Sequence, residues 1–317
     1  MIDELLMEGQ SAEIKVVGIG GGGSNVIDMM HEDITEGVNF LVFNTDAQVL
    51  GRSKAKNRIQ IGEKLTRGLG AGADPEMGYR SMNQDLPMMS EIVDDTDMIF
   101  VVACLGGGTG SGASVPFIEM CRKKGILTVA VVTLPFLFEG RKRRKVADQA
   151  LEAITSRADT TVVLNNDNIL KHIEKNIPLR ESFRVVDRYL SHNINSVISM
   201  INSPGIINLD FADIRTILRR SGVAVFGSGS ATGEKRAGEA LEKALSSHLL
   251  DRNIEKAGRV LLNITGPDDL SLFEINSIAQ KVQDEVGEDA NIIFGAASNG
   301  TEKGEVSVTL LVSGFDD

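Results

Sequence analysis

Short, continuously apolar runs alternate with longer amphipathic segments over the first half of the chain. Continuous rather than alternating hydrophobicity is typical of strands that are buried on both faces of a parallel sheet. We therefore expect an α/β fold with a Rossmann-like parallel-sheet domain over residues 1–177. The expected strands are 14–20, 40–43, 98–103, 126–133 and 160–165, and 59–61 is compatible with one more. The expected helices are about 26–33, 75–93, 113–124 and 140–157.

One apolar stripe with helical spacing follows, over residues 178–202. It predicts a single long helix, with Pro178 in the first turn and Ser203-Pro204-Gly205 after the last. A helix of this length spans roughly 36 Å, enough to connect two domains. The members of the stripe are Leu179, Phe183, Val186, Leu190, Ile194, Val197 and Ile201.

The remaining residues, 203–317, mix strands and helices without the βα alternation of the first half. We expect an α+β domain here, with helices on one face of its sheet. In the last strand Val306, Val308, Leu310 and Val312 alternate with other residues, which favours one buried face. The expected helices are about 211–220, 234–250 and 271–286. The expected strands are 222–226, 259–265, 290–297 and 305–313, with a glycine/serine turn at 227–233.

Composition and charge argue against nucleic-acid-binding, metal-binding and membrane-spanning classes of protein. The 317 residues predict about two domains, and a net charge of −11 argues against a nucleic-acid partner. Cys104 and Cys121 lack metal-ligand spacing, so we expect no metal held by protein side chains alone. The amino terminus is acidic, unlike a signal peptide, and no apolar run reaches the roughly 18 residues of a membrane span. We expect a cytoplasmic protein without direct membrane insertion.

The most informative segment is Cys104-Leu-Gly-Gly-Gly-Thr-Gly-Ser-Gly112, between an expected strand and an expected helix. A loop with so few side chains lets several backbone N–H groups converge on one anion, and Thr109 and Ser111 add hydroxyl groups. No lysine follows, so this is not the GxxxxGK[ST] phosphate loop. Similar glycine loops occur at 20–25 and 67–75, again after strands. The pattern favours a nucleoside polyphosphate bound by backbone dipoles at the carboxyl ends of the strands.

A dinucleotide-binding enzyme is the main alternative. Gly18, Gly20 and Gly23 satisfy GxGxxG, and Asp46 follows the next strand, where a ribose-binding acid would lie. Such an enzyme needs one glycine loop, whereas this chain has three, and the loop at 106–112 fits no dinucleotide fingerprint.

Six motifs together resemble the tubulin/FtsZ family, and in particular its FtsZ members, the prokaryotic relatives of tubulin. They occur in the family's order over about 300 residues. Besides GGGTGSG at 106–112, they are GGGGSN (20–25), NTDAQ (44–48), GLGAGADP (68–75), PFLFEGRKRR (135–144), the asparagine pair 165–166 and NLDFAD (208–213).

The resemblance implies a GTPase domain, a connecting helix and a second domain. It also implies head-to-tail self-assembly, a role in cell division, and a cytoplasmic ring at mid-cell. GTP and GDP would be the ligands. Mg²⁺ would bridge the phosphates mostly through water, with Asn44 and Asp46 as outer groups.

The resemblance also implies which residues contact the nucleotide. Asp187 would read the guanine with Asn25 and Asn166, and Phe183 would stack on the ring; alternatively, Phe183 only extends the core stripe and Asp187 is solvated. Glu139 and Arg143 would contact ribose, although their i, i+4 spacing also makes an ordinary surface pair. The phosphate-binding residues would be Gly20, Gly21, Gly22, Ala71, Gly72, Ala73, Gly107, Gly108, Thr109, Gly110, Ser111 and Gly112. The basic run 141–145 would offset ligand charge or lie in solvent.

Two aspartates are the implied catalytic residues. Asp210 and Asp213 lie three residues apart at an expected helix start, where a capping residue and a first-turn acid are also ordinary. In the resembled family these acids enter the nucleotide pocket of the next subunit and orient the attacking water, supported here by Asn208. A structural paralogue that binds nucleotide without turnover is the remaining alternative.

Two positions depart from the usual FtsZ pattern. Ser111 replaces a more common threonine and keeps the hydroxyl group. The printed chain ends at Phe315-Asp316-Asp317, just past the last expected strand, without the family's partner-binding tail peptide. Division-machinery adaptors are therefore possible partners, but tethering through that tail is not expected from these residues.

Overall fold

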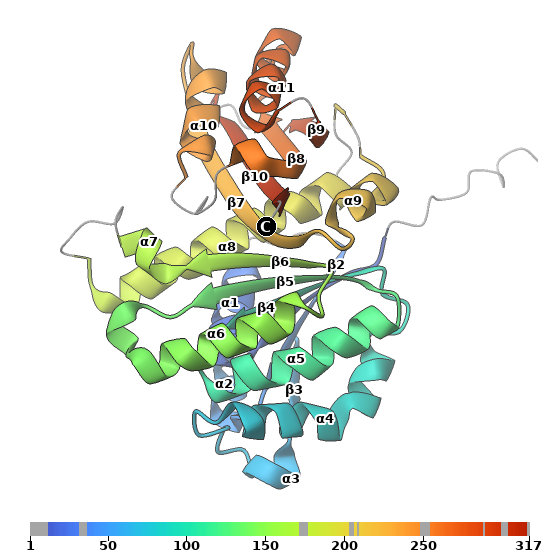
Figure 1. Cartoon of the computed structure of the whole chain (residues 1–317), viewed down its shortest axis with the longest axis vertical. Helices are drawn as coiled ribbons and strands as arrows, with labels where there is room; N and C mark the ends of the chain where they lie inside the picture. The colour runs from blue at the N-terminus through green and yellow to red at the C-terminus, as the bar shows by residue number, and fades with distance from the viewer. Residues whose placement is uncertain are drawn as a thin grey trace, which may run out of the picture.

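One continuous sheet runs through the molecule (Figure 1). The computed structural model describes residues 12–31, 37–170, 177–202, 206–207, 209–247, 254–287, 289–298 and 304–315. Within them ten strands pair in the order β3-β2-β1-β4-β5-β6-β7-β10-β8-β9.

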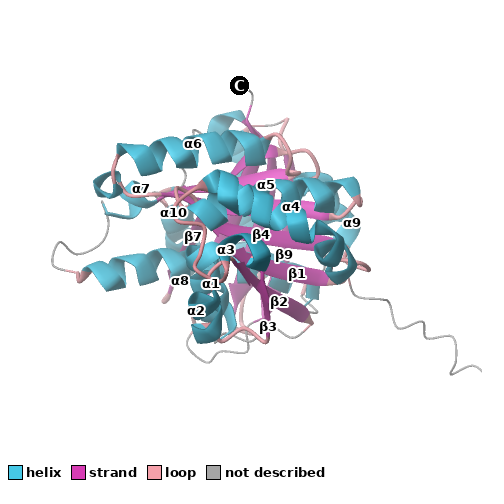
Figure 2. Cartoon of the chain, turned by 90° about the horizontal axis from the view of Figure 1, so that it is seen from below, coloured by secondary structure: helices cyan, strands magenta, loops and turns pink. Residues whose placement is uncertain are grey.

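The first six strands are parallel, as the continuous apolar runs predict. Neighbouring positions along a strand face opposite ways, so Val17 packs with α4, α5 and α6 while Val16 packs with α1 and α8. Figure 2 shows α4, α5 and α6 along one side of the strands. The strands are β1 (Ile14–Ile19), β2 (Val38–Asn44), β3 (Asn57–Gln60), β4 (Met98–Cys104), β5 (Leu127–Leu134) and β6 (Thr160–Asn165). The helices are α1 (Gly20–Met30), α2 (Ala47–Arg52), α3 (Glu63–Thr66), α4 (Pro75–Ile92), α5 (Gly108–Lys123), α6 (Arg141–Thr155) and α7 (Asn166–Leu170), with a 3-10 turn at Leu137–Glu139.

Two helices begin earlier than predicted, because their glycine motifs form the first helical turn rather than a loop. α1 begins at Gly20 and α5 at Gly108. Glycine is a poor helix former, which is why the sequence pattern favoured loops. Packing decides otherwise: a Cβ at Gly20, whose φ is +77°, would lie 2.9 Å from the backbone N of Gly110, and a Cβ at Gly112 would overlap the carbonyl oxygen of Pro75 in α4. Glycine lets these helices approach closely.

The long helix α8 (Leu179–Asn202) agrees with the predicted span. Its buried stripe includes Leu190, Ile194 and Val197, which join one core with Val26 of α1 and Phe226 of β7. α8 therefore packs against both halves of the molecule.

The second half is built on β7 (Gly222–Ala231), β8 (Ala257–Gly266), β9 (Asn291–Ser298) and β10 (Val306–Phe315), where β10 is antiparallel to β7 and β8. The predicted turn at 227–233 was wrong over 227–231, because these residues pair with β10. The expectation of helices on one face was also wrong. α10 (Arg236–Leu245) and α11 (Leu272–Val286) cover one face, while α8 and α9 (Phe211–Leu218) pack on the other. A 3-10 turn, Ile254–Lys256, precedes β8.

The two halves join where β6 and β7 pair in parallel, from Thr160 with Gly222 to Val162 with Ala224. The sheet has no break at this junction, and the predicted domain boundaries stay predictions. No helix of the described residues is long and apolar enough to cross a membrane.

Candidate functional site

A pocket of about 320 Å³ opens at the carboxyl ends of β4, β5 and β6. This is the edge at which parallel α/β sheets bind ligands. The pocket brings together twelve residues that sequence reasoning had singled out. They are Gly21, Gly22, Asn25, Gly107, Gly108, Thr109, Gly110, Glu139, Arg143, Asn166, Phe183 and Asp187.

The floor of the pocket consists of two helix N-termini. Gly21 lies in the first turn of α1, and Gly107 is the N-cap of α5. A Cβ built at either residue would meet no atom within 4 Å, so both glycines border open space. Helix N-termini present unpaired N–H groups and a partial positive charge. Two of them in one glycine-lined pocket form a binding site for an anion.

The far end of the pocket offers hydrogen-bond acceptors. Asn166 is buried, and its Oδ1 has no hydrogen-bond partner among the described residues. Asp187 is also buried, and desolvation raises the pKa of its carboxyl group to about 7, although Arg184 acts in the opposite direction. A buried acceptor without a donor costs free energy, so a ligand with N–H donors fits this end.

An aromatic wall adjoins these acceptors. Phe183 is 36% exposed and packs edge-on against buried Phe136, with ring centroids 5.3 Å apart. Its exposed part lines the pocket. Phe183 therefore contributes to the core and to the pocket at once, so the two sequence interpretations are compatible.

Glu139 and Arg143 form the i, i+4 ion pair, with Arg143 Nε 3.2 Å from Glu139 Oε2. The other carboxylate oxygen accepts a hydrogen bond from the backbone N of Phe136. Both side chains line the pocket, so the surface pair and the ligand contact are again compatible.

Several predicted phosphate contacts lie outside the pocket lining. Ser111 is buried and its hydroxyl accepts a hydrogen bond from the backbone N of Gly106, 2.8 Å away, so this side chain supports the loop from behind. Gly112 packs on α4, and Gly20, the first residue of α1, packs against Gly110 of α5. Because α5 begins at Gly108, the Ser111 side chain and the Cα of Gly112 face the interior. The predicted phosphate contacts of Gly20, Ser111 and Gly112 stay predictions.

The loop at 67–73 borders the start of α5 without lining the pocket. Ala71 is buried, and a Cβ at Gly108 would lie 2.8 Å from the Cβ of Ala71. Gly72 and Ala73 both adopt left-handed backbone conformations, with φ of 59° each. The predicted terminal-phosphate contacts of these three residues stay predictions.

Asn44 and Asp46 are engaged within the protein. Asp46 Oδ1 accepts hydrogen bonds from the backbone N of Gln48 and Val49 at the start of α2. Asn44 Oδ1 accepts one from the backbone N of Asp46. The described part of the chain contains no group of three His, Cys, Asp or Glu residues that could hold a metal ion. These residues therefore form no metal cage by themselves.

Five lining residues were missed by sequence reasoning: Cys104, Leu105, Thr133, Pro135 and Val186. Burial raises the pKa of the Cys104 thiol to about 12, so the thiol stays protonated. Four of the five, all except Val186, lie at or just beyond the carboxyl ends of β4 and β5. The rule that ligands bind at those ends could have found them.

The predicted catalytic acids lie at the opposite edge of the sheet. Asp210 is the N-cap of α9, and Asp213 lies in its first turn; both are exposed. The Asp210 side chain makes no capping hydrogen bond, so the capping interpretation is not supported. Arg215 of the same helix donates to the carbonyl oxygen of Gly125, which precedes β5. Asn208 lies outside the described residues.

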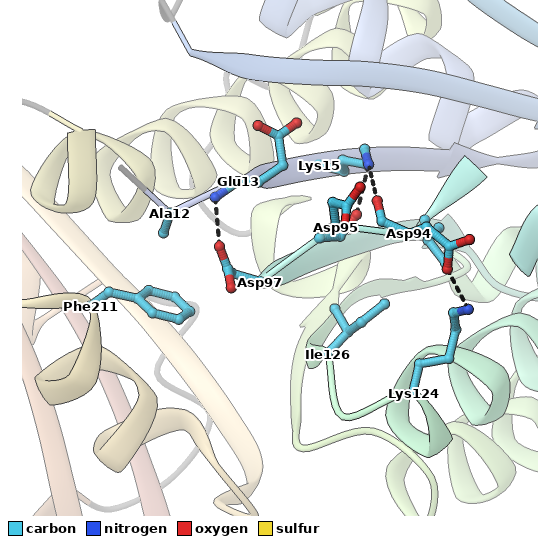
Figure 3. A pocket seen from close by; sticks show the side chains of 11 residues that line it. Ala12, Glu13, Lys15, Asp94, Asp95, Asp97, Lys124, Ile126 and Phe211 are labelled. Atoms are coloured by element: carbon cyan, nitrogen blue, oxygen red, sulfur yellow. Dashed lines mark hydrogen bonds and ion pairs between the residues drawn. The ribbon is translucent and has the colours of Figure 1, made fainter. Parts of the chain in front are cut away.

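A second cavity, of about 1200 Å³, marks this edge. Figure 3 shows Phe211 of α9 facing Ala12 and Asp97, which precede β1 and β4. Because these residues lie at the amino ends of parallel strands, α9 and the pocket described above are at opposite edges. No described acid other than Glu139 and Asp187 lines the pocket.

Comparisons with known proteins agree over nearly the whole chain. The profile of the tubulin/FtsZ family GTPase domain matches residues 13–174, and that of the FtsZ family C-terminal domain matches residues 222–316. An empty FtsZ dimer from M. jannaschii is 39% identical, with a TM-score of 0.93 over 98% of this chain and 90% of that chain. CetZ2 from Haloferax volcanii, solved as a GTPγS-bound protofilament, is 19% identical, with a TM-score of 0.82 over 96% of this chain and 93% of that chain. At this lower identity the likeness concerns the fold alone.

Proposed function

The chain belongs to the tubulin/FtsZ family, and on this premise we propose that it is a GTP-dependent polymerising GTPase of cell division. Copies stack head to tail, and each copy supplies Asp210 and Asp213 to the nucleotide held by its neighbour. The observation that supports this most directly is the separation of the two parts of the site. The anion-binding pocket lies at one edge of the sheet, and the exposed acids lie at the other.

Guanine fits the acceptor end of the pocket. Its N1–H and exocyclic amine are donors, and the Asp187 carboxylate and the unpaired Asn166 Oδ1 are acceptors. Adenine has an unprotonated N1 at the matching position and would leave a buried acceptor unpaired. Mismatches of this kind discriminate strongly between ligands. Asn25 adds an amide beside the base, and Glu139 and Arg143 bind the ribose.

The phosphates are bound by the N-termini of α1 and α5, with Thr109 adding a hydroxyl group. No lysine is among the described residues that line the pocket, so the phosphates are bound by backbone dipoles. Ala71, Gly72 and Ala73 contact the terminal phosphate. Mg²⁺ would neutralise negative charge on the phosphates. The protein would contact it mostly through water, with Asn44 and Asp46 as outer groups.

Hydrolysis needs a group that orients water in line with the terminal phosphate. The pocket's own acids are committed: Glu139 pairs with Arg143, and Asp187 lies at the base end. Asp210 and Asp213 of the next copy, with Asn208 in support, supply that group. A head-to-tail contact of this type is heterologous and generates open filaments.

We base the proposed role in cell division on how similar this chain is in sequence to the two kinds of family member. Identity is 39% to the M. jannaschii FtsZ and 19% to CetZ2. We therefore assign this chain to the division branch, with assembly in a cytoplasmic ring at mid-cell and with division adaptors as possible partners.

The experiment is a sedimentation assay with GTP or GDP, combined with phosphate release as a function of protein concentration. We expect pelleting with GTP only, and turnover that begins above a threshold concentration. Turnover strictly proportional to concentration would contradict a site shared between copies. Stable filaments without phosphate release would identify a structural paralogue. A melting shift with NAD but not GTP would favour a dinucleotide enzyme.

A further inference from the structure

Thr45 is a completely buried polar residue that directly follows the carboxyl end of β2. It does not line the pocket, in contrast to Thr109 in the first turn of α5. The two hydroxyl groups are nevertheless in contact, with their Oγ1 atoms 2.7 Å apart. A buried side chain behind the pocket is therefore connected to one that faces the ligand.

The direction of this hydrogen bond follows from the burial of Thr45. A hydroxyl group has one hydrogen to donate and two lone pairs that accept. Among the described residues, the Thr45 hydroxyl has Thr109 Oγ1 as its one hydrogen-bond partner. A buried donor without an acceptor costs free energy, so Thr45 donates and Thr109 accepts. The hydrogen of the Thr109 hydroxyl then remains for a group in the pocket, which Thr109 lines.

The backbone of Thr45 is held in place by a second set of contacts. Its carbonyl oxygen accepts hydrogen bonds from the backbone N of Gly70 and from the Thr66 hydroxyl, both at 3.2 Å. Gly70 belongs to the loop at 67–73, and Thr66 directly precedes that loop. The Thr45 hydroxyl is therefore oriented before any ligand binds, and a donor fixed in advance needs no reorganisation when the ligand arrives.

We propose that Thr45 is a positioning residue for phosphate binding: it donates to Thr109 and so directs the Thr109 hydroxyl hydrogen at a phosphate oxygen. The inference rests on the nucleotide binding proposed above and adds to it a residue that does not touch the ligand. The donated hydrogen bond also polarises the Thr109 hydroxyl, because hydrogen bonds in a chain strengthen one another. Binding of the base and the ribose does not depend on Thr45, because other residues make those contacts.

Equilibrium binding to the dilute protein tests the inference. We expect Thr45→Val, which keeps the shape of the side chain but lacks the hydroxyl group, to weaken binding of GTP and of GDP roughly tenfold. Guanosine, which has no phosphate, should compete for the pocket as well as it does in the unmodified chain. Thr45→Ser should restore most of the lost affinity, because it keeps the hydroxyl group. Thr45→Ala is the second variant without a hydroxyl group, for use if Thr45→Val does not fold.

Two further variants separate positioning from packing. Thr161→Val is the matched control, because Thr161 is also a buried threonine but its hydroxyl has no hydrogen-bond partner among the described residues. We expect its nucleotide binding to be unchanged. Thr109→Val removes the group through which Thr45 acts. The double variant Thr45→Val, Thr109→Val should therefore bind GTP no more weakly than Thr109→Val alone.

Three results would overturn the inference while the proposed function stands. They are normal GTP affinity in Thr45→Val, an equal loss of affinity for GTP and guanosine, and additive losses in the double variant. In each of these cases the unmodified chain still binds GTP. If the unmodified chain does not bind GTP, the proposed function falls and this inference falls with it.

Discussion

The two edges of the central sheet differ in the kind of chemical group that they present. At the carboxyl edge, helices α1 and α5 begin, and the pocket is lined with glycines, backbone N–H groups and buried acceptors. At the amino edge, α9 presents the exposed carboxylates of Asp210 and Asp213. One edge is suited to binding an anion, and the other to orienting water. In the function proposed above, one copy therefore binds the nucleotide and the next copy supplies the acids.

The difference follows from the geometry of a parallel sheet. Helices that follow a strand begin at its carboxyl end, so the positive ends of their dipoles gather there. A free carboxylate beside these helix N-termini would repel a bound anion. Of the two described acids that line the pocket, Glu139 is paired with Arg143, and Asp187 is buried with a raised pKa. In the proposed assembly, Asp210 and Asp213 therefore come near the nucleotide only when a neighbouring copy docks.

The largest expected effect comes from removing one acid at the amino edge. We expect Asp213→Ala to lower the rate of GTP hydrolysis roughly 100-fold or more, because the attacking water loses its orienting group. Binding of GTP by the dilute protein should be nearly unchanged. Phosphate release and equilibrium binding measure the two effects. Asp284→Ala, on the exposed side of α11, is the control. Loss of binding in Asp213→Ala would refute the separation of roles.

The same substitution at two glycines of the carboxyl edge should affect different properties: nucleotide affinity at Gly21 and stability at Gly112. Gly21→Ala adds a methyl group toward open pocket space, so we expect GTP affinity to fall roughly tenfold with little change in melting temperature. Gly112→Ala drives a methyl group into the backbone of α4, so we expect the free energy of unfolding to fall by about 2–3 kcal/mol. Calorimetric unfolding and nucleotide titration distinguish them. Equal loss of stability in both would mean that the pocket floor is packing surface.

The pH dependence of nucleotide affinity tests the base end of the pocket. Burial raises the pKa of Asp187 from 3.8 to about 7, and guanine needs the ionised carboxylate. We expect GTP affinity to fall about tenfold for each pH unit below this value.

The raised pKa also means that the free protein loses stability as pH rises from about 4 to about 7. Asp187→Asn should remove the pH dependence and raise the melting temperature of the nucleotide-free protein at pH 8. An affinity that is flat between pH 5 and 8 in the unmodified chain would contradict this assignment.

The smallest expected effect concerns the second half of the molecule. Arg236 lowers the pKa of the Glu274 carboxyl from 4.5 to about 2. The stabilisation from this pair is therefore present above about pH 4.5 and is lost as pH falls toward about 2. We expect Arg236→Ala to reduce the free energy of unfolding by about 1 kcal/mol at pH 7 and by less at pH 3. Thermal unfolding at the two pH values measures it. Nucleotide binding by the dilute protein should not change.

Much of the fold could be predicted from local patterns. The parallel strands are buried on both faces, so they are continuously apolar and could be predicted from such runs. Helix α8 buries one side, so its apolar residues from Leu179 to Ile201 recur with helical spacing, and this stripe predicted the helix. The errors concern segments rich in glycine and serine. Residues 227–231 were taken for a turn, yet they pair with β10, and a Cβ at Gly229 would overlap the backbone of α10. Close approach of a neighbouring element leaves no trace in local hydrophobicity.

The candidate site divides in the same way. The sequence determined which residue types are available: glycines after strands, a carboxylate and an amide that both line the pocket, and a pair of aspartates at a helix start. Tertiary structure alone decided that Ser111 supports a loop while Thr109 lines the pocket, because the register of α5 sets which side of the helix each residue occupies. It also decided that Asp210 and the pocket lie at opposite edges, because strand direction in space is set by pairing between segments far apart in the chain.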